Sequence, residues 1–210
     1  ASHNEIIATL PQTIPTAHVI SSAGCPTGDK LHFTPEGARE FGKRYAAAML
    51  PLLKQEPAKE IKVEDGGQGP YSAVATESPA LAGMTIYRPQ DLSVFGTERK
   101  LPVLLWGNGA CANTTEEHKN FLNEIASHGY IVLGIGLLSE IEQRTDASRG
   151  RTTSAQMLAA LDWIVAENAK SDGVYSGKID TTKVAAMGMS CGGLQAIEIS
   201  GDPRITTTVV

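Results

Sequence analysis

The sequence feature that most constrains the fold is the run VAAMGMSCGG at residues 184–193. It places a G-x-S-x-G pattern directly after an apolar run and directly before residues that suit a helix. This context predicts a sharp strand-to-helix turn that holds the hydroxyl of Ser190 above a sheet, where a base can reach it. Gly188 and Gly192 suit a turn in which the backbone comes too close for a side chain. The N–H of Cys191 would then point at an oxyanion formed on an attacked carbonyl group.

The same pattern also occurs by chance, so the prediction depends on the surrounding strand, helix and Gly193.

Composition excludes other classes of protein. A net charge of -5 gives no reason to expect nucleic-acid binding, which usually needs a basic patch. No apolar run approaches the roughly 18 residues of a membrane span, and residues 1–24 lack the profile of a signal peptide. The three cysteines are too few for a disulfide scaffold and too scattered for a zinc site, and nothing implies a metal or cofactor.

The N-terminal part reads as a separate segment, residues 1–53, with a strand at 17–21 and a helix after Thr34. Thr34 suits the N-cap, Pro35 the first helical position, and apolar residues recur at spacings of three and four. These apolar residues predict one buried face, and the charged residues between them a solvated one. The first group is Ala38, Phe41, Tyr45, Met49 and Leu52, and the second is Arg39, Glu40, Lys43 and Arg44. Charge, proline and glycine then predict a linker over residues 54–69.

Residues 70–210 alternate between predicted strands and predicted helices. The strands are expected at 71–76, 84–88, 101–106, 130–135, in the run before Gly188 and at 205–210, and the helices at 116–127, 154–169 and after Ser190. Apolar core positions are expected at Phe121, Leu122 and Ile125 and at Met157, Leu161, Ile164 and Val165. Residues 144–151 are polar and predict a loop. The alternation predicts an α/β fold with a mostly parallel sheet flanked by helices, preceded by a small α/β segment.

Five matching pieces make residues 66–210 resemble the α/β-hydrolase superfamily, and in particular its polyesterase, cutinase-like and dienelactone-hydrolase-like members. The pieces lie at 69–71, 85–89, 105–109, 126–130 and 188–193. The resemblance implies ester hydrolysis with Ser190 as the nucleophile. It also implies an acid and a histidine beyond Val210, so that the hydrolase fold in this chain would be incomplete.

The resemblance also assigns the second donor of the oxyanion hole to the loop after the strand at 101–106. That loop reads Gly107-Asn108-Gly109-Ala110, and the N–H of Asn108 is the preferred donor, beside that of Cys191. If the two strands are neighbours, Cys111 and Cys191 both lie beside this hole. They would then form a disulfide across it or remain two buried free thiols, and the residues alone leave both alternatives open.

Serine chemistry needs a base, and in this superfamily the order along the chain is serine, acid, histidine. The histidines are His3, His18, His32, His118 and His128, so none follows Ser190. Only two carboxylates, Glu198 and Asp202, follow the serine, and neither occupies the expected place. His128 is expected to cap a helix and His118 to be solvated. The sequence therefore predicts a nucleophile and oxyanion donors without their acid and base.

Residues 1–53 resemble the last segment of SGNH-type esterases, similar to the acetylxylan esterase and sialate O-acetylesterase group. The residues that carry this are 29–33, DKLHF, and the helix through residues 42–46. In that family a D-x-x-H pair supplies the acid and base of the triad, which would be Asp29 and His32. The alternative is a loop histidine packed beside a salt-bridged helix. The family's G-D-S and G-x-N-D blocks are absent from the sequence.

Together these features predict a secreted serine esterase acting on acetyl or feruloyl esters of plant polysaccharide, or on other small esters. A polyesterase or cutinase-like enzyme is one alternative. Two others are a composite triad, in which Asp29 and His32 serve Ser190, and a non-catalytic binding or assembly protein that kept the fold. The expected partner is an ester substrate, with no nucleic acid and no membrane; the sequence does not indicate the oligomeric state.

Overall fold

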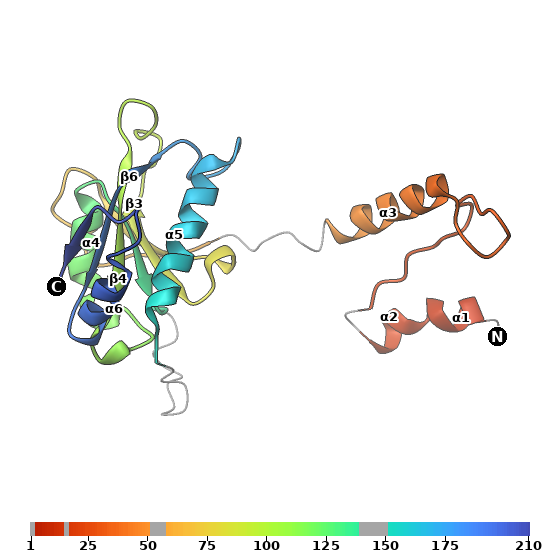
Figure 1. Cartoon of the computed structure of the whole chain (residues 1–210), viewed down its shortest axis with the longest axis horizontal. Coiled ribbons are helices and arrows are strands. Elements are labelled where there is room, and N and C mark those ends of the chain that lie inside the picture. The colour runs from red at the N-terminus through yellow and green to blue at the C-terminus, as the bar shows by residue number, and fades with distance from the viewer. Residues whose placement is uncertain (1–2, 15–16, 51–57, 139–150) are drawn as a thin grey trace. The chain divides into compact units, whose positions relative to one another are not determined.

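The computed structural model describes residues 3–14, 17–50, 58–138 and 151–210 (Figure 1). The chain separates into two compact units, Ala1–Gln55 and Glu56–Val210. We refer to them as unit 1 and unit 2 and describe each by itself.

Unit 1 is helical, with α1 (His3–Ala8), α2 (Leu10–Thr13) and α3 (Pro35–Met49). The predicted start of α3 is confirmed: Thr34 is extended and its hydroxyl oxygen accepts a hydrogen bond from the Gly37 N–H at 3.1 Å. The strand predicted at residues 17–21 is wrong, because these residues are irregular and find no partner strand. An isolated bridge between Thr27 and Phe33 is the one β pairing among the described residues of unit 1, so the expected small α/β segment does not form.

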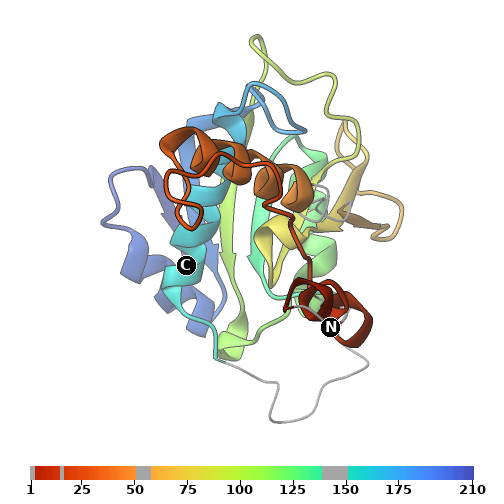
Figure 2. The same cartoon turned by 90° about the vertical axis from the view of Figure 1, so that its right-hand side faces the viewer.

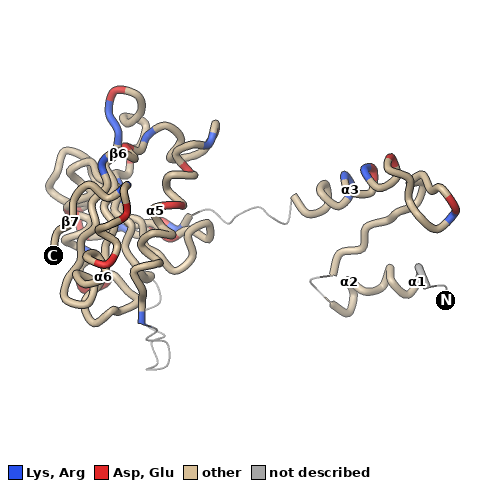
Figure 3. Tube along the Cα trace, viewed as in Figure 1, with Lys and Arg blue, Asp and Glu red and all other residues tan. Residues whose placement is uncertain are grey.

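The apolar stripe of α3 is not buried as expected, and its last predicted residue, Leu52, lies outside the described residues. The ring of Phe41 lies 4.9 Å from that of Tyr45 between centroids, and Tyr45 and Met49 are 46% and 50% exposed. One residue of the charged side is not simply solvated either. Arg44 is half-buried and donates to the carbonyl oxygens of Ser21 and Ala23 at 2.9 and 2.8 Å. Figure 3 shows basic and acidic residues alternating along α3. The helix thus holds the preceding segment through hydrogen bonds from the Arg44 guanidinium and through the contact between the rings of Phe33 and Phe41, 5.2 Å apart between centroids.

Unit 2 is built on one seven-stranded sheet with the strand order β1-β2-β3-β5-β4-β6-β7. Its strands are β1 (Lys59–Ile61), β2 (Ala73–Glu77), β3 (Met84–Pro89), β4 (Leu101–Gly107), β5 (Ile131–Ile135), β6 (Ile179–Gly188) and β7 (Thr207–Val209). The pairs from β1 to β5 are antiparallel, whereas β5, β4, β6 and β7 are mutually parallel. The predicted α/β class is confirmed, and the sheet is mixed, with its parallel half around β4 and β6.

The two faces of the sheet are covered by different helices because successive residues of a strand point to opposite faces. In β4, Val103 and Leu105 pack with α5 (Ser154–Ala169) and α6 (Cys191–Ile199), while Leu104 and Trp106 pack with α4 (Lys119–Ser127). Figure 1 shows α4 and α5 on opposite sides of the sheet, and the turned view in Figure 2 shows α5, in cyan, running along the strands. Three short 3₁₀ turns complete the unit: η1 (Pro79–Leu81), η2 (Gly109–Cys111) and η3 (Glu116–His118).

Most predicted elements of unit 2 form within two residues of their expected bounds, and the differences are local. Met157, Leu161 and Ile164 are fully buried, and Val165 packs against their cluster. Phe121 was expected in the core but is 44% exposed. Residues 59–61, expected in the linker, form β1 because they pair with β2. Of the loop predicted at 144–151, all but the last residue lies outside the described residues. Within the described ranges, every helix is too short or too polar to span a bilayer.

Candidate active site

Ser190 occupies the predicted turn between β6 and α6. Its backbone has φ 52° and ψ -115°, and the side chain is exposed. Positive φ is unfavourable for a residue with a β-carbon and costs of the order of 1–3 kcal/mol, so it persists only where the surroundings impose it. Ser190 is therefore held, under strain, at the carboxyl end of a central strand.

Glycines make this turn possible through close backbone approach. A β-carbon on Gly188 would collide with the carbonyl group of Gly192, and one on Gly192 would collide with the carbonyl group of Gly107. The same β-carbon on Gly192 would lie 2.6 Å from the backbone nitrogen of Asn108. Gly107 and Gly188 are register partners in neighbouring strands, and the Met189 N–H donates to the Gly107 carbonyl oxygen at 3.2 Å. The turn at Ser190 and the loop after β4 thus touch backbone to backbone.

The two predicted oxyanion donors lie at this contact. Cys191 is the first residue of α6, and the first N–H groups of a helix have no acceptor within the helix. The positive end of the helix dipole adds to the attraction for an anion there. The N–H groups of Cys191 and Asn108 are suited to stabilise an oxyanion formed beside Ser190.

The side chain of Asn108 is committed to the structure and leaves only its backbone for chemistry. Its Oδ1 accepts from Trp106 Nε1 at 2.8 Å, and its Nδ2 donates to the carbonyl oxygens of Ala112 and Ile135 at 2.9 and 2.7 Å. The residue is 2% exposed. The amide therefore fixes the loop after β4 and, through it, the direction of the Asn108 N–H.

Cys111 and Cys191 form a disulfide with their Cα atoms 5.2 Å apart, so the structure favours this alternative over two free thiols. Cys111 is the last residue of η2 and Cys191 directly follows Ser190. The third cysteine, Cys25 in unit 1, is a buried free thiol. A covalent link thus spans the two elements that carry the oxyanion donors.

No histidine is hydrogen-bonded to Ser190 among the described residues. His118 was expected to be solvated, but it is half-buried beside the turn, with Nε2 3.4 Å from the Met189 Sδ and its ring 5.1 Å from that of Trp106. His128 caps the C-terminus of α4, as predicted, and its Nε2 lies 3.0 Å from the Glu124 Oε1. The neighbourhood of His118 was missed because η3 is remote from Ser190 in sequence.

Neither carboxylate after Ser190 is hydrogen-bonded to a histidine among the described residues. Asp202 is bound by Arg204, whose Nη2 lies 2.8 Å from Oδ2, and hydrogen bonds from the Arg204 side chain lower the pKa of Asp202 to about 2. Glu198 is exposed on α6. The structure thus brings together Ser190, Asn108 and Cys191 and adds no acid–base pair from residues 191–210.

Asp29 and His32 do form a pair, in unit 1. Asp29 Oδ2 lies 2.7 Å from His32 Nδ1, and Oδ1 accepts from the N–H groups of His32 and Leu31 at 2.7 and 3.0 Å. The hydrogen bond from the His32 side chain, with those two N–H groups, lowers the pKa of Asp29 below its ordinary value. Both side chains are exposed, at 57% and 83%. A carboxylate on Nδ1 is the arrangement that orients an imidazole for proton transfer at Nε2.

The sequence pattern of the PET hydrolase-like family matches residues 66–209, more than half of the chain. The chain belongs to the PET hydrolase-like family. This assignment supports ester hydrolysis as the reaction class and agrees with the α/β-hydrolase type of sheet. The PET hydrolase-like region contains Ser190, Asn108 and the disulfide, whereas Asp29 and His32 lie before it.

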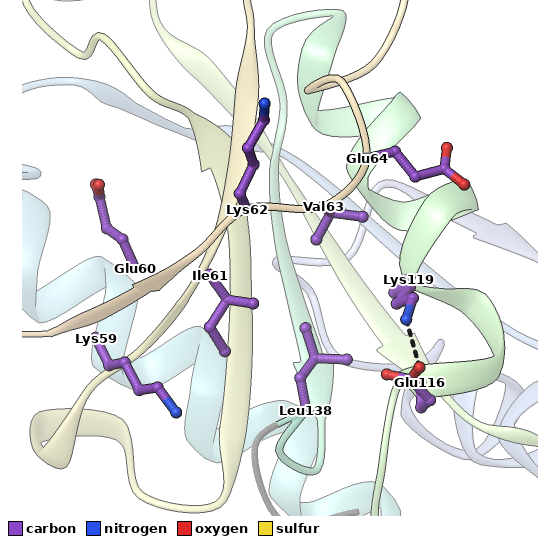
Figure 4. Close-up of a pocket in the computed structure, with 9 residues that line it drawn as sticks. All are labelled: Lys59, Glu60, Ile61, Lys62, Val63, Glu64, Glu116, Lys119 and Leu138. Carbon is purple, nitrogen blue, oxygen red and sulfur yellow. Dashed lines mark hydrogen bonds and ion pairs between the residues drawn. The ribbon is translucent and has the colours of Figure 1, made fainter.

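A pocket of about 500 Å³ lies elsewhere in unit 2 (Figure 4). Its lining includes Lys59, Ile61 and Leu138, and a Lys119–Glu116 ion pair crosses one wall. It adjoins β1 at the antiparallel edge of the sheet, with β2, β3, β5 and β4 between β1 and the strand that leads to Ser190. Its lining does not include Ser190, Asn108 or Cys191, so the pocket is distinct from the candidate nucleophile and oxyanion donors. Within the described part of the chain, no group of three or more His, Cys, Asp and Glu residues is placed to hold a metal ion.

Sequence reasoning also missed Gln195, which supports the site from α6. It is 4% exposed, and its Nε2 donates to the carbonyl oxygen and hydroxyl oxygen of Thr152 at 2.8 and 3.1 Å. The signal was present in the sequence, because a lone amide lies four residues after Cys191 in an otherwise apolar stretch. Residues four apart on a helix share one face.

Proposed function

We propose that unit 2 is a serine carboxylic ester hydrolase with Ser190 as its nucleophile. Attack of the Ser190 Oγ on an ester carbonyl forms a tetrahedral intermediate, whose oxyanion the N–H groups of Cys191 and Asn108 stabilise. Loss of the alcohol leaves an acyl-enzyme, which water then hydrolyses. The observation that carries the proposal is the exposed, positive-φ serine in backbone contact with the loop after β4.

The reaction needs a base that takes the proton from Ser190 and returns it to the leaving alcohol. Family resemblance assigns this role to a histidine that follows the serine in chain order, held by a carboxylate. Residues 191–210 contain no histidine, so no residue in that stretch is assigned to this role.

The family assignment favours a polyester or another apolar ester as substrate. The exposed surface supports this choice, because Met189 and Leu194, on either side of Ser190 in sequence, are 43% and 62% exposed. Acetyl or feruloyl esters of plant polysaccharide remain the second proposed class. We also propose an extracellular location, which the disulfide supports because such bonds persist in oxidising compartments.

The decisive experiment is labelling by a fluorophosphonate, together with turnover of p-nitrophenyl acetate and butyrate. Peptide mass spectrometry is expected to find the label on Ser190, and Ser190→Ala is expected to abolish both labelling and turnover. Ser200→Ala, at an exposed serine after α6, is the matched control and is expected to behave like the parent. Absence of both label and turnover would favour the non-catalytic assembly protein.

A second candidate function rests on the Asp29–His32 geometry. We propose that this pair is the acid–base element of an SGNH-type esterase segment, as the resemblance of residues 1–53 implies. A composite triad, in which this pair serves Ser190, is the alternative left open by the sequence, although a covalent tether alone does not preorganise a site. Equal fluorophosphonate labelling of the parent and of His32→Ala would exclude the composite triad. Loss of labelling in His32→Ala and in Asp29→Asn would support it.

A further inference from the structure

The disulfide connects the two backbone elements that would form the oxyanion hole. Cys191 lies next to the nucleophile and contributes one donor N–H, while Cys111 closes the loop that begins with the other donor, Asn108. The two cysteines are 80 residues apart in sequence, with a Cα–Cα distance of 5.2 Å. The bond thus fixes a distance within the proposed site rather than joining remote surfaces of the unit.

The loop from Asn108 to Cys111 has a conformation that its own residues disfavour. Ala110 and Cys111 have φ 54° and 51°, two consecutive left-handed residues that carry β-carbons. Such residues persist only where contacts with the rest of the structure hold them. In this loop the strain lies between Asn108 and the disulfide.

Apart from the disulfide, hydrogen bonds hold the end of the loop, including the one within the loop from Asn108 Nδ2 to the Ala112 carbonyl oxygen at 2.9 Å. The Cys111 carbonyl oxygen accepts from the N–H and hydroxyl of Thr152 at 3.1 and 3.2 Å. Gln195 on α6 holds Thr152 in turn, and its Nε2 lies 3.5 Å from the Cys111 sulfur. These are hydrogen bonds to a neighbouring loop, and the disulfide is the covalent connection to α6.

We propose that the Cys111–Cys191 disulfide is a positioning element of the oxyanion hole, so that its reduction lowers the rate at which Ser190 is acylated without unfolding unit 2. The inference rests on the proposed function of Ser190. Without the bond, Ala110 and Cys111 relax from their left-handed conformation, and the start of α6, with the Cys191 N–H, is no longer held covalently against the anchored Asn108 N–H. Oxyanion stabilisation is sensitive to such displacements because both donors must point at one atom. Both cysteines are half-buried, which leaves the bond within reach of a small reductant.

The test begins with reduction of the full chain by a water-soluble phosphine in a Cys25→Ser background. The phosphine donates two electrons to the disulfide, while water supplies the oxygen of the phosphine oxide and the two protons of the thiols. Cys25→Ser removes the free thiol of unit 1, so that alkylation and intact mass report the Cys111–Cys191 pair alone.

Hydrogen exchange read by mass spectrometry follows the loop independently of activity. We expect exchange of the amides at 108–112 to accelerate by about tenfold or more on reduction, while β4, β5 and α5 keep their protection. Unchanged exchange at 108–112, or loss of protection throughout unit 2, would overturn the proposal. The second result would show that the disulfide stabilises unit 2 as a whole.

Fluorophosphonate labelling of Ser190 provides the functional readout. We expect the second-order labelling rate to fall roughly 10- to 100-fold on reduction and to return on reoxidation. Equal labelling rates in the two redox states would overturn the proposal. Lack of labelling in both states would instead count against Ser190 as a nucleophile, and the exchange result alone would then decide whether the bond positions the loop.

A pair of variants separates loop positioning from a general loss of stability. Cys111→Ala with Cys191→Ala is expected to reproduce the reduced state. Cys111→Gly with Cys191→Ala and Ala110→Gly is expected to recover part of the labelling rate, because glycine adopts positive φ without strain. Thermal unfolding of both variants is measured in parallel, because glycine also relieves strain at these positions; recovery of the labelling rate in proportion to a gain in stability alone would contradict a positioning role.

Discussion

Gly192 lies against the carbonyl group of Gly107 so closely that a β-carbon on Gly192 has no space. The contact joins the start of α6 to the end of β4 and brings the Asn108 nitrogen next to the helix N-terminus. A side chain at Gly192 could therefore be admitted only if α6 or the loop after β4 moved. The two glycines thus set how closely these two elements approach each other at the proposed oxyanion hole.

Gly192→Ala is expected to destabilise unit 2 by about 1–3 kcal/mol and to reduce labelling of Ser190, because the added methyl group forces α6 away from the loop after β4. Urea unfolding monitored by circular dichroism measures the first effect. Gly201→Ala is the control, because its β-carbon would meet nothing within 4 Å. Similar stabilities for the two variants would contradict the close packing at Gly192.

Ser190→Gly is expected to abolish fluorophosphonate labelling and yet to stabilise the unit by roughly 0.5–1 kcal/mol. The reason is that glycine tolerates φ 52°, whereas serine is strained there. Thermal unfolding followed by circular dichroism measures the gain. The contrasting variant is Ser200→Gly, where φ is -60° and glycine should be destabilising. A loss of stability in Ser190→Gly would show that the turn is not under the strain described.

Sequence patterns predicted the parallel half of the sheet and the turn at Ser190 because these depend on local signals. A continuous apolar run such as residues 101–106 predicts a central strand, and glycines on both sides of Ser190 predict a sharp turn. The strand at 59–61 was missed because it is short and polar and is created by its pairing with β2. The strand expected at 17–21 failed for the opposite reason, since a suitable pattern without a partner does not form a sheet.

Of the residues at the candidate site, the sequence predicted only those whose positions follow from the pairing of strands in the sheet. Asn108 and Cys191 come together because Gly107 and Gly188 pair across neighbouring strands, an adjacency that the sequence analysis stated only as a condition. Gln195, Thr152 and His118 reach the site through side-chain contacts between segments that lie far apart in sequence. Periodicity carries no information on such contacts, so these residues could be assigned only from the structure.

The Asp29 carboxyl is expected to titrate below its ordinary pKa of 3.8, chiefly because the side chain of His32 hydrogen-bonds to it. A depressed pKa in the folded state means that the contribution to stability is present above 3.8 and is lost as the pH falls through the folded-state value. Carbon-detected NMR of the carboxyl group measures the titration midpoint. In His32→Ala the midpoint should rise towards 3.8, and an unchanged midpoint would contradict the pairing.

Substitutions at Gln195 should distinguish loss of a hydrogen bond from burial of a charge. Gln195→Leu removes the donor to Thr152 and is expected to cost about 1–3 kcal/mol, because a buried acceptor loses its partner. This loss of stability is partly offset, because the leucine also removes the Gln195 Oε1, which is buried without a hydrogen-bond partner among the described residues. Gln195→Glu removes the same donor and also buries a carboxylate. Its cost in stability should therefore be larger at neutral pH and should shrink as the pH falls and the carboxylate is protonated.

Urea unfolding at two pH values tests this order, with Gln90→Leu at an exposed position as the control. Equal costs for the leucine and glutamate variants at both pH values would show that the amide is not buried against Thr152.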